Sequence, residues 1–313
     1  MHGLIIVLLA LFILMLISGL MIFVMGCLRK KEMDWFSEDA LRNTQYEKFY
    51  SNVLIGAKFL EDHSAEELWI KSYDGLNLHG HFIPAENPKG TILLAHGYRS
   101  NRLLEFGQVF DFYHNKGLNI LVPEQRCHGK SEGKYITFGV KESSDMKAWI
   151  EYHNETYGKF PMILSGLSMG ASTMLYLADE PLADNVKGII ADCGFTSPKA
   201  IISSVFEAVT HLPALPSLWI ADLFTRAIAG FRLNEKDTVK SLMHSKLPVL
   251  LVHGVDDGFV PCTMTQMGYD ACTAKKKLLL VEGADHGVSF LVDRERYVDL
   301  VTEFLQENLG EIQ

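Results

Sequence analysis

The chain lacks several features that would assign it to common classes of protein. Its 313 residues contain 38 acidic and 29 basic side chains, giving a formal net charge of −9. Because binding to nucleic acid needs clustered Lys and Arg, this balance argues against a nucleic-acid partner. No linker rich in Gly, Ser or Pro, no low-complexity tract and no internal repeat interrupts the middle of the chain. With 48% hydrophobic and 21% charged residues, the composition is that of a globular protein with a sizeable core.

Cysteine is scarce and scattered. The chain has five cysteines, with no C-x-x-C pair and no spacing to histidine that is typical of a zinc site. An odd number of isolated cysteines predicts reduced thiols, as in a protein that faces the cytoplasm. We therefore expect no disulfide and no zinc site.

Charge is missing from residues 3–28, which are mostly Leu, Ile, Val, Phe and Met. A run of about 25 apolar residues can cross a bilayer as one helix. It is too long for the apolar region of a cleaved signal peptide, and it has neither a basic start nor an A-x-A site. The sequence "VMGC" ending at Cys27 resembles a lipoprotein signal only faintly. We therefore predict a transmembrane anchor over residues 1–28.

The charges that flank this segment predict its orientation. Arg29, Lys30 and Lys31 follow it directly, whereas only His2 precedes it. Because basic residues stay on the cytoplasmic side, we expect a single-pass protein whose bulk faces the cytoplasm. Residues 29–67 mix charged and aromatic residues at helical spacing, which predicts amphipathic linker helices.

Residues 68–313 carry the pattern of an α/β domain. Two alternating runs around Asp74 and Gly75 predict an antiparallel hairpin. The later strand candidates are continuous apolar runs, which indicates strands buried on both faces of a parallel sheet. Helical patterns separate most of them, so we predict a mostly parallel, doubly wound sheet with ligands at the carboxyl ends of the strands. These runs are "GTILLAHG", "NILVPE", "FPMILSGLS", "VKGIIADCG", "LPVLLVHG" and "KKLLLVEG".

One connection in this pattern is unusually long. Between "ADCGF" and "LPVLL" lies an apolar segment that prolines divide into helical pieces. These pieces could be ordinary core helices. Their position after the carboxyl end of a strand favours a helical cap that consists of residues 197–245 and lies over the site.

Ser168 is the strongest candidate for a nucleophile. It lies in "GLSMG", residues 166–170, which matches G-x-S-x-G between an apolar strand and a helical segment. Glycines on both sides permit a sharp reversal of the chain. The turn would place the hydroxyl at the positive N-terminal end of the following helix.

A nucleophilic serine needs a base, and imidazole titrates in the right range. His286, in "VEGADHG", follows the last strand and would reach the same sheet edge as Ser168. A carboxylate must orient that imidazole, and "LLVHGVDDGFVP" offers Asp256 and Asp257 side by side. The order Ser, Asp, His is the one expected for this type of triad. Only one of the two carboxylates can face the imidazole.

From Leu68 onward the chain resembles the alpha/beta-hydrolase superfamily. Members commonly show H-G-x-x-D-x-x-V-P, here "HGVDDGFVP", and this resemblance implies that Asp257 is the acid. It also implies an oxyanion hole made by the backbone N–H groups of Met169 and, in "AHGYRSN", Tyr98.

Two further loops resemble those of the superfamily. The stretch "PEQRCHGKSEG" at 123–133 resembles D-x-R-G-H-G-x-S-x-G but has Glu124 and Cys127 in place of Asp and Gly. Its residues are expected to be structural. Asp192 and Cys193 in "ADCGFTSP" are expected to be packing and loop residues, and a catalytic acid at Asp192 is the minor alternative.

The resemblance implies hydrolysis through an acyl-Ser168 intermediate. We expect no metal and no cofactor, because this reaction needs neither. Ester, thioester and peptide substrates share this constellation, and fold resemblance does not separate them. An apolar cap and a membrane anchor favour a hydrophobic, lipid-like ester. A peptidase would need an acidic subsite for a substrate amine, and no sequence feature identifies one. A membrane-tethered binding module with an idle triad is a further alternative, against which the presence of all three residues argues.

Overall fold

The computed structural model describes residues 2–31, 33–42, 47 and 50–310. Parts of the predicted anchor and linker segments, residues 1, 32, 43–46, 48 and 49, lie outside the described residues, as do residues 311–313 of the predicted domain. The strands are β1 (Glu66–Lys71), β2 (Asn77–Ile83), β3 (Gly90–Ala95), β4 (Leu118–Pro123), β5 (Met162–Leu167), β6 (Val186–Asp192), β7 (Val249–Gly254) and β8 (Lys276–Val281). The helices are α1 (His2–Cys27), α2 (Glu38–Leu41), α3 (Tyr50–Asp62), α4 (Arg102–Phe106), α5 (Phe110–Asn115), α6 (Val140–Thr156), α7 (Met169–Leu175), α8 (Pro198–Thr210), α9 (Leu215–Phe224), α10 (Thr238–Met243), α11 (Thr263–Ala271), α12 (Ser289–Val292) and α13 (Arg294–Leu309), with a π-helical turn at Thr225–Ala229.

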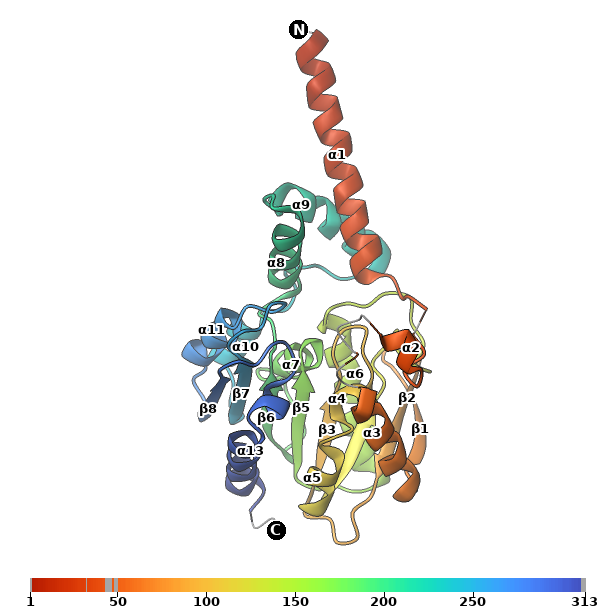
Figure 1. Cartoon of the computed structure of the whole chain (residues 1–313), viewed down its shortest axis with the longest axis vertical. Coiled ribbons are helices and arrows are strands. Elements are labelled where there is room, and N and C mark those ends of the chain that lie inside the picture. Colours follow the sequence, from red (N-terminus) through yellow and green to blue (C-terminus); the bar gives the residue numbers. More distant parts are fainter. Residues whose placement is uncertain (1, 32, 43–46, 48–49, 311–313) are drawn as a thin grey trace.

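The strands form one sheet in the order β1-β2-β4-β3-β5-β6-β7-β8 (Figure 1). β2 pairs antiparallel with β1 and β4, and all later neighbours are parallel. The predicted hairpin turn is present, and Gly75 has a φ of +88°, which glycine adopts without strain. The prediction of a mostly parallel α/β sheet with an antiparallel N-terminal hairpin is therefore confirmed.

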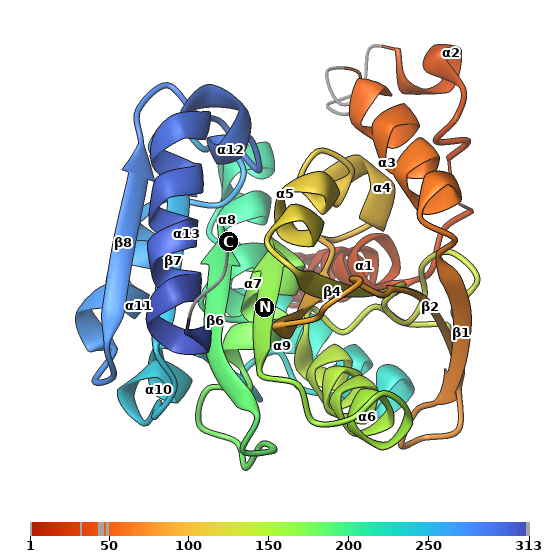
Figure 2. The same cartoon turned by 90° about the horizontal axis from the view of Figure 1, so that it is seen from below.

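Helices cover both faces of the sheet (Figure 2). Alternate residues of one strand point to opposite faces, so on β3 Ile92 and Leu94 join one apolar cluster and Leu93 joins the other. The first cluster includes residues of α3, α4, α5 and α13, and the second includes residues of α6, α7 and α10. Burial on both faces explains why the strands read as continuous apolar runs.

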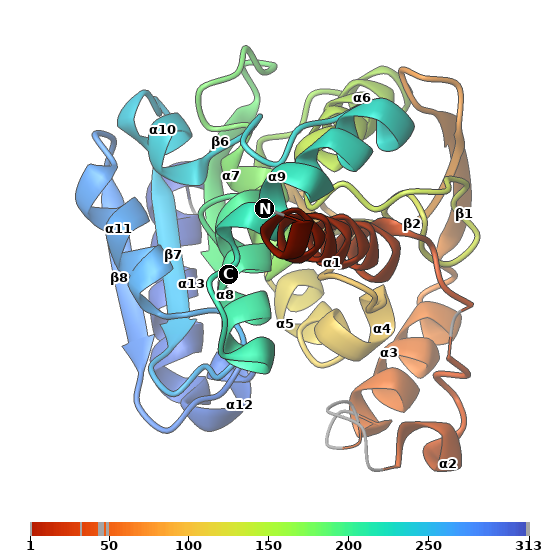
Figure 3. The same cartoon turned by 90° about the horizontal axis from the view of Figure 1, so that it is seen from above.

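A third apolar cluster joins α1 to the predicted cap. Phe23 of α1 packs here with Ile201 of α8 and Leu218 of α9, and Figure 3 shows α1 lying beside α9. Among the described residues, α1 is the one helix that is long and apolar enough to cross a membrane by length and composition. Its end nevertheless contacts the domain: Phe23 and Cys27 are buried, and the Ile136 N–H donates to the carbonyl of Cys27 at 2.7 Å.

Trp149 of α6 is expected to be a main determinant of stability. Its side chain is fully buried, and its ring lies so close to β2 that a Cβ on Gly80 would be 3.0 Å away. We expect Trp149→Ala to lower the free energy of unfolding by about 3–5 kcal/mol, because it leaves a large cavity. Chemical denaturation of the detergent-solubilised full chain, followed by circular dichroism, measures this change. Trp69→Ala is the matched control because Trp69 is 47% exposed, and an equal loss in both variants would contradict the expectation.

Candidate active site

Ser168 occupies a sharp turn between β5 and α7. Its φ of +56° and ψ of −116° lie outside the regions that a non-glycine residue normally adopts. The turn needs the glycines around it, because a Cβ on Gly166 would lie 2.3 Å from the carbonyl carbon of Gly170. A Cβ on Gly170 would lie only 1.8 Å from the carbonyl oxygen of Ala95 at the end of β3. The G-x-S-x-G spacing therefore reflects two close backbone approaches.

Three predicted side chains meet at this edge of the sheet. His286, in the loop after β8, has its Nε2 2.9 Å from the hydroxyl of Ser168. Its Nδ1 lies 2.7 Å from Oδ2 of Asp257, in the loop after β7. The Asp257 side chain is fully buried, whereas 22% of the His286 side chain is exposed. The arrangement is a continuous chain of hydrogen bonds that runs from a buried carboxylate to the hydroxyl of Ser168.

Asp257, and not Asp256, faces the imidazole. Oδ1 of Asp257 accepts the N–H groups of Phe259 and Val260, each at 2.8 Å. Burial alone would raise the pKa of the Asp257 carboxyl, but hydrogen bonds from His253 and His286 hold that pKa well below its usual range. Asp257 is thus kept ionised, whereas Asp256 is exposed to solvent.

Met169 lies where an oxyanion donor is expected. It is the first residue of α7, and the first N–H groups of a helix have no acceptor within the helix. The helix also presents its positive end at this point.

The loop that carries Tyr98 runs alongside Ser168. A Cβ on Gly97 would lie 3.2 Å from the Cβ of Ser168. On one side of Tyr98, the N–H of Gly97 donates to Oε2 of Glu105 at 2.7 Å. On the other side, the N–H of Arg99 donates to Nε2 of His128 at 2.9 Å. The backbone around Tyr98 is therefore fixed by protein contacts on both sides.

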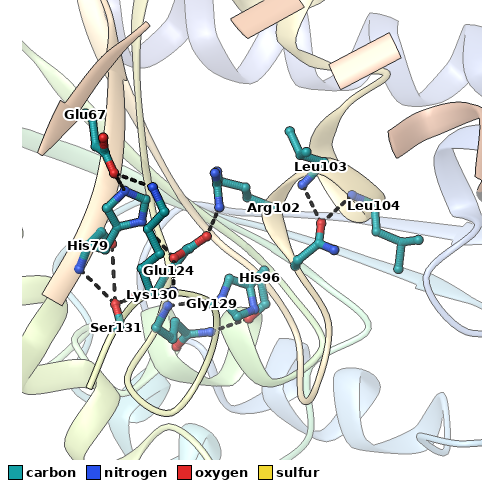
Figure 4. A network of polar contacts seen from close by, with 12 residues as sticks. Glu67, His79, His96, Arg102, Leu103, Leu104, Glu124, Gly129, Lys130 and Ser131 are labelled. Atoms are coloured by element: carbon teal, nitrogen blue, oxygen red, sulfur yellow. Dashed lines mark hydrogen bonds and ion pairs between the residues drawn. The ribbon is translucent and has the colours of Figure 1, made fainter. Parts of the chain in front are cut away.

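A buried polar network holds this loop against the loop after β4 (Figure 4). Glu124 contacts the guanidinium of Arg102, accepts the backbone N–H of Lys130 at 2.6 Å, and lies 2.7 Å from Nδ1 of His79. Nε2 of His79 lies 2.8 Å from Glu67 on β1. Burial lowers the pKa of His79 to about 4, so this imidazole is neutral at pH 7. Glu124, where the superfamily commonly has Asp, thus links β2, α4 and the loop after β4.

Ser168 and His286 open onto a cavity of about 430 Å³. Its walls include the carboxyl groups of Glu105 on α4 and Asp192 at the end of β6. Burial raises the pKa of Glu105 to about 8 and that of Asp192 to about 6. None of residues 197–245, the predicted cap, lines this cavity. Apolar side chains make up much of the remainder: Leu104, Phe106, Val109, Leu167, Phe259, Phe290 and Leu291.

The sequence gives no indication that Glu105 lies at the cavity, and it favours a packing role for Asp192, which also lines the cavity. Glu105 belongs to no motif and reaches the site only because α4 folds back against the Gly97 loop. The position of Asp192 after a strand in a parallel sheet was the signal available for it.

Cys193 lies near the site, where its thiol, Asp257 and His286 offer ligand atoms within 4.8 Å of one another. Burial raises the pKa of Cys193 well above its usual value, so the sulfur stays protonated. Because metal binding needs a thiolate, and the other two groups already bond each other, this set is a poor metal site.

The chain matches known proteins over most of its length. A family described as serine aminopeptidase, S33, matches residues 86–244. The Bacillus subtilis (strain 168) protein YqkD is 30% identical over 237 residues, which cover 75% of this chain and 77% of that protein. A Saccharomyces cerevisiae protein named as a membrane protein, YNL320W, is 24% identical over 245 residues, covering 77% of this chain and 80% of its own length.

Solved structures agree with this assignment. The Pyrococcus furiosus esterase Pf2001 superposes with a TM-score of 0.66 and 25% identity over 80% of this chain and 96% of the esterase. The Pyrococcus horikoshii acylaminoacyl peptidase shares the fold, with a TM-score of 0.59 and 18% identity over 80% of this chain and 42% of the peptidase. The chain is an alpha/beta hydrolase of esterase or peptidase type and belongs to the family described as serine aminopeptidase, S33.

Proposed function

We propose that the protein is a serine hydrolase that cleaves a hydrophobic ester-type acyl substrate through an acyl-Ser168 intermediate. The observation that carries this proposal is the chain of hydrogen bonds from Asp257 through His286 to Ser168, whose last two members line the cavity. A buried carboxylate, an imidazole and a hydroxyl in this order are the parts that acyl transfer requires. The similarity to the esterase Pf2001 supports the same reaction class.

In the first half of the reaction, Oγ of Ser168 attacks the substrate carbonyl carbon while Nε2 of His286 takes the hydroxyl proton. The ionised Asp257 holds the imidazole in one tautomer and stabilises its positive charge. The backbone N–H groups of Met169 and Tyr98 are the proposed donors to the oxyanion. The intermediate collapses, the proton passes from His286 to the leaving alcohol, and the acyl group stays on Ser168.

In the second half, water attacks the acyl-Ser168 carbonyl and gives a proton to His286. The tetrahedral intermediate releases the carboxylic acid, and His286 returns the proton to Ser168. None of these steps uses a metal or a cofactor.

We further propose that residues 1–28 anchor the protein in a membrane as a single span. Helix α1 is long and apolar enough for this role, and YNL320W is named as a membrane protein. Arg29, Lys30 and Lys31 after the span favour a cytoplasmic hydrolase domain. An enzyme held at a bilayer meets acyl lipids at high local concentration, which favours a hydrophobic ester.

A fluorophosphonate probe tests the nucleophile. The full chain in detergent should be labelled covalently, and Ser168→Ala should abolish labelling and lower ester hydrolysis by a factor of about 10⁴ or more. Met169→Leu is the control and should keep both labelling and hydrolysis. In the proposed reaction Met169 contributes only its backbone N–H, and the replacement conserves side-chain volume. If folded wild-type protein is not labelled, the chain is better described as a membrane-tethered binding module.

Asp257→Asn tests the orienting carboxylate. Because an amide holds the imidazole in the wrong tautomer, kcat for ester hydrolysis should fall by about 10⁴-fold. Asp256→Asn is the matched control, since the neighbouring side chain is exposed and should leave kcat close to wild type. Equal losses in the two variants would contradict the assignment.

An amidase or peptidase is the second candidate, and one observation favours it. Glu105 and Asp192 line the cavity beside Ser168, where carboxyl groups could receive a substrate amine. If these carboxyl groups bind a substrate amine, the enzyme should prefer aminoacyl amides to acyl esters. Glu105→Gln should then raise KM for the amide and leave KM for an uncharged ester unchanged. Comparing kcat/KM for esters of graded chain length with that for aminoacyl amides decides the question. A preference for esters that Glu105→Gln does not alter would exclude amine recognition at this carboxyl.

A further inference from the structure

The cap presents an apolar surface beside α1. Large apolar side chains point outward from the end of α8, the following turn and the outer face of α9, and Trp219 is 66% exposed. We call these residues the cap tip: Val209, Leu212, Leu215, Trp219 and Leu223. Isolated exposed apolar residues are common, but a group of five on one short segment indicates a surface that is covered.

Helix α9 is packed lengthwise against α1 (Figures 1 and 3). The hydroxyls of Ser18 and Ser217 lie 2.5 Å apart. The helices are so close that a Cβ on Gly19 would lie 2.5 Å from the side chain of Ile220. Farther along, the rings of Phe23 and Phe224 are stacked with their centroids 6.1 Å apart. The position of α9 is thus coupled to that of α1.

The length of α1 decides where α9 must lie. Ser18 precedes Arg29 by about three helical turns, roughly 16 Å along the axis. If only the residues before Ser18 lay in lipid, α1 would contribute roughly 24 Å, which is shorter than the ~30 Å hydrocarbon core of a bilayer. A span of about 20 residues starting near Leu4 reaches Phe23. The part of α1 that packs against α9 is therefore needed to cross the membrane.

We propose that α9 and the α8–α9 turn enter the apolar part of the membrane together with α1, so that the cap tip contacts lipid. This inference rests on the proposed membrane crossing by α1. It gives the cap a role other than lining the substrate cavity. The hydrolase site would then open next to the membrane surface.

The polar groups of the cap tip region are compatible with this placement. The Asp222 carboxylate accepts the N–H of Leu233 at 2.7 Å. Glu207 accepts the N–H of Ala214 at 3.3 Å and the hydroxyl of Ser203 at 3.2 Å. His211 ends α8 in the left-handed conformation and is exposed. Both carboxyl groups are bonded within the protein, which lowers the cost of removing them from water.

Fluorescence quenching by lipid tests the proposal on the full chain. Cysteines introduced one at a time at Trp219 and Leu215 are labelled with an environment-sensitive nitrobenzoxadiazole fluorophore. The background variant is Cys262→Ser, in which the four remaining native cysteines are buried. The proteins are reconstituted into phosphatidylcholine vesicles with and without a nitroxide on the acyl chain. We expect the labels on Trp219→Cys and Leu215→Cys to emit at shorter wavelength than the same fluorophore does in water. We also expect the nitroxide lipid to quench most of their emission. Trp69→Cys is the matched control on β1 and should not be quenched.

A further label at Ile13→Cys, in the N-terminal half of α1, separates this inference from the proposed anchor. Quenching at Ile13 without quenching at Trp219 and Leu215 would overturn the inference and leave the anchor intact. Absence of quenching at all three positions would overturn both. Cross-linking between copies through Trp219→Cys, without quenching by lipid, would assign the cap tip to a second copy of the chain instead.

Discussion

The close contact between the start of α7 and the end of β3 is the constraint on which the site depends. Gly170 lies against the carbonyl of Ala95, and Gly166 against Gly170, with no room for a Cβ at either position. At this contact Ser168 has a φ of +56° and a ψ of −116°, a strained conformation that costs about 1–3 kcal/mol. Hydrogen bonding of β5 to β3 and β6 on its two sides offsets that cost. The hydroxyl is consequently held toward the cavity by the backbone itself, before any partner side chain contributes.

The other groups reach Ser168 because the strands are parallel, but local polar contacts give them their positions. Parallel strands bring the loops after β3, β5, β7 and β8 to one edge of the sheet. Asp257 is fixed by two backbone N–H groups and by His253, whose Nε2 lies 3.1 Å from the carboxylate. The loop after β3 is fixed by Glu105, by His128 and by the network around Glu124. Groups held in this way need little reorganisation when charge develops on a substrate, and such preorganisation is a large part of catalytic electrostatics.

The fold and the three central residues could be predicted from the sequence because their signals are local. Continuous apolar strands, the glycines around Ser168 and the loops after the last two strands each lie within a few residues. The choice between Asp256 and Asp257 could not be made from the residues alone. It depends on which of the two carboxyl groups accepts a hydrogen bond from the N–H of Val260. Glu105 and the contact of α1 with α9 could not be predicted either. Both join segments far apart in the chain, and helical patterns such as those around Glu105 and Ile220 fix the face of a helix but not its partner.

Helix α1 also has a structural role in the hydrolase domain, apart from the proposed membrane span. Its end shares an apolar cluster with Met169 and Tyr98, the two proposed oxyanion donors. The hydroxyl of Tyr98 donates to the carbonyl of Gly26 at 2.7 Å, and the guanidinium of Arg99 donates to that of Leu28 at 3.0 Å. These carbonyls lie at or just after the C-terminal end of α1, where no N–H group of the helix can donate to them, so the domain supplies the donors. The same loop is bonded to α1 on one side and to Glu105 and His128 on the other, so a displacement of α1 would also displace the backbone beside Ser168.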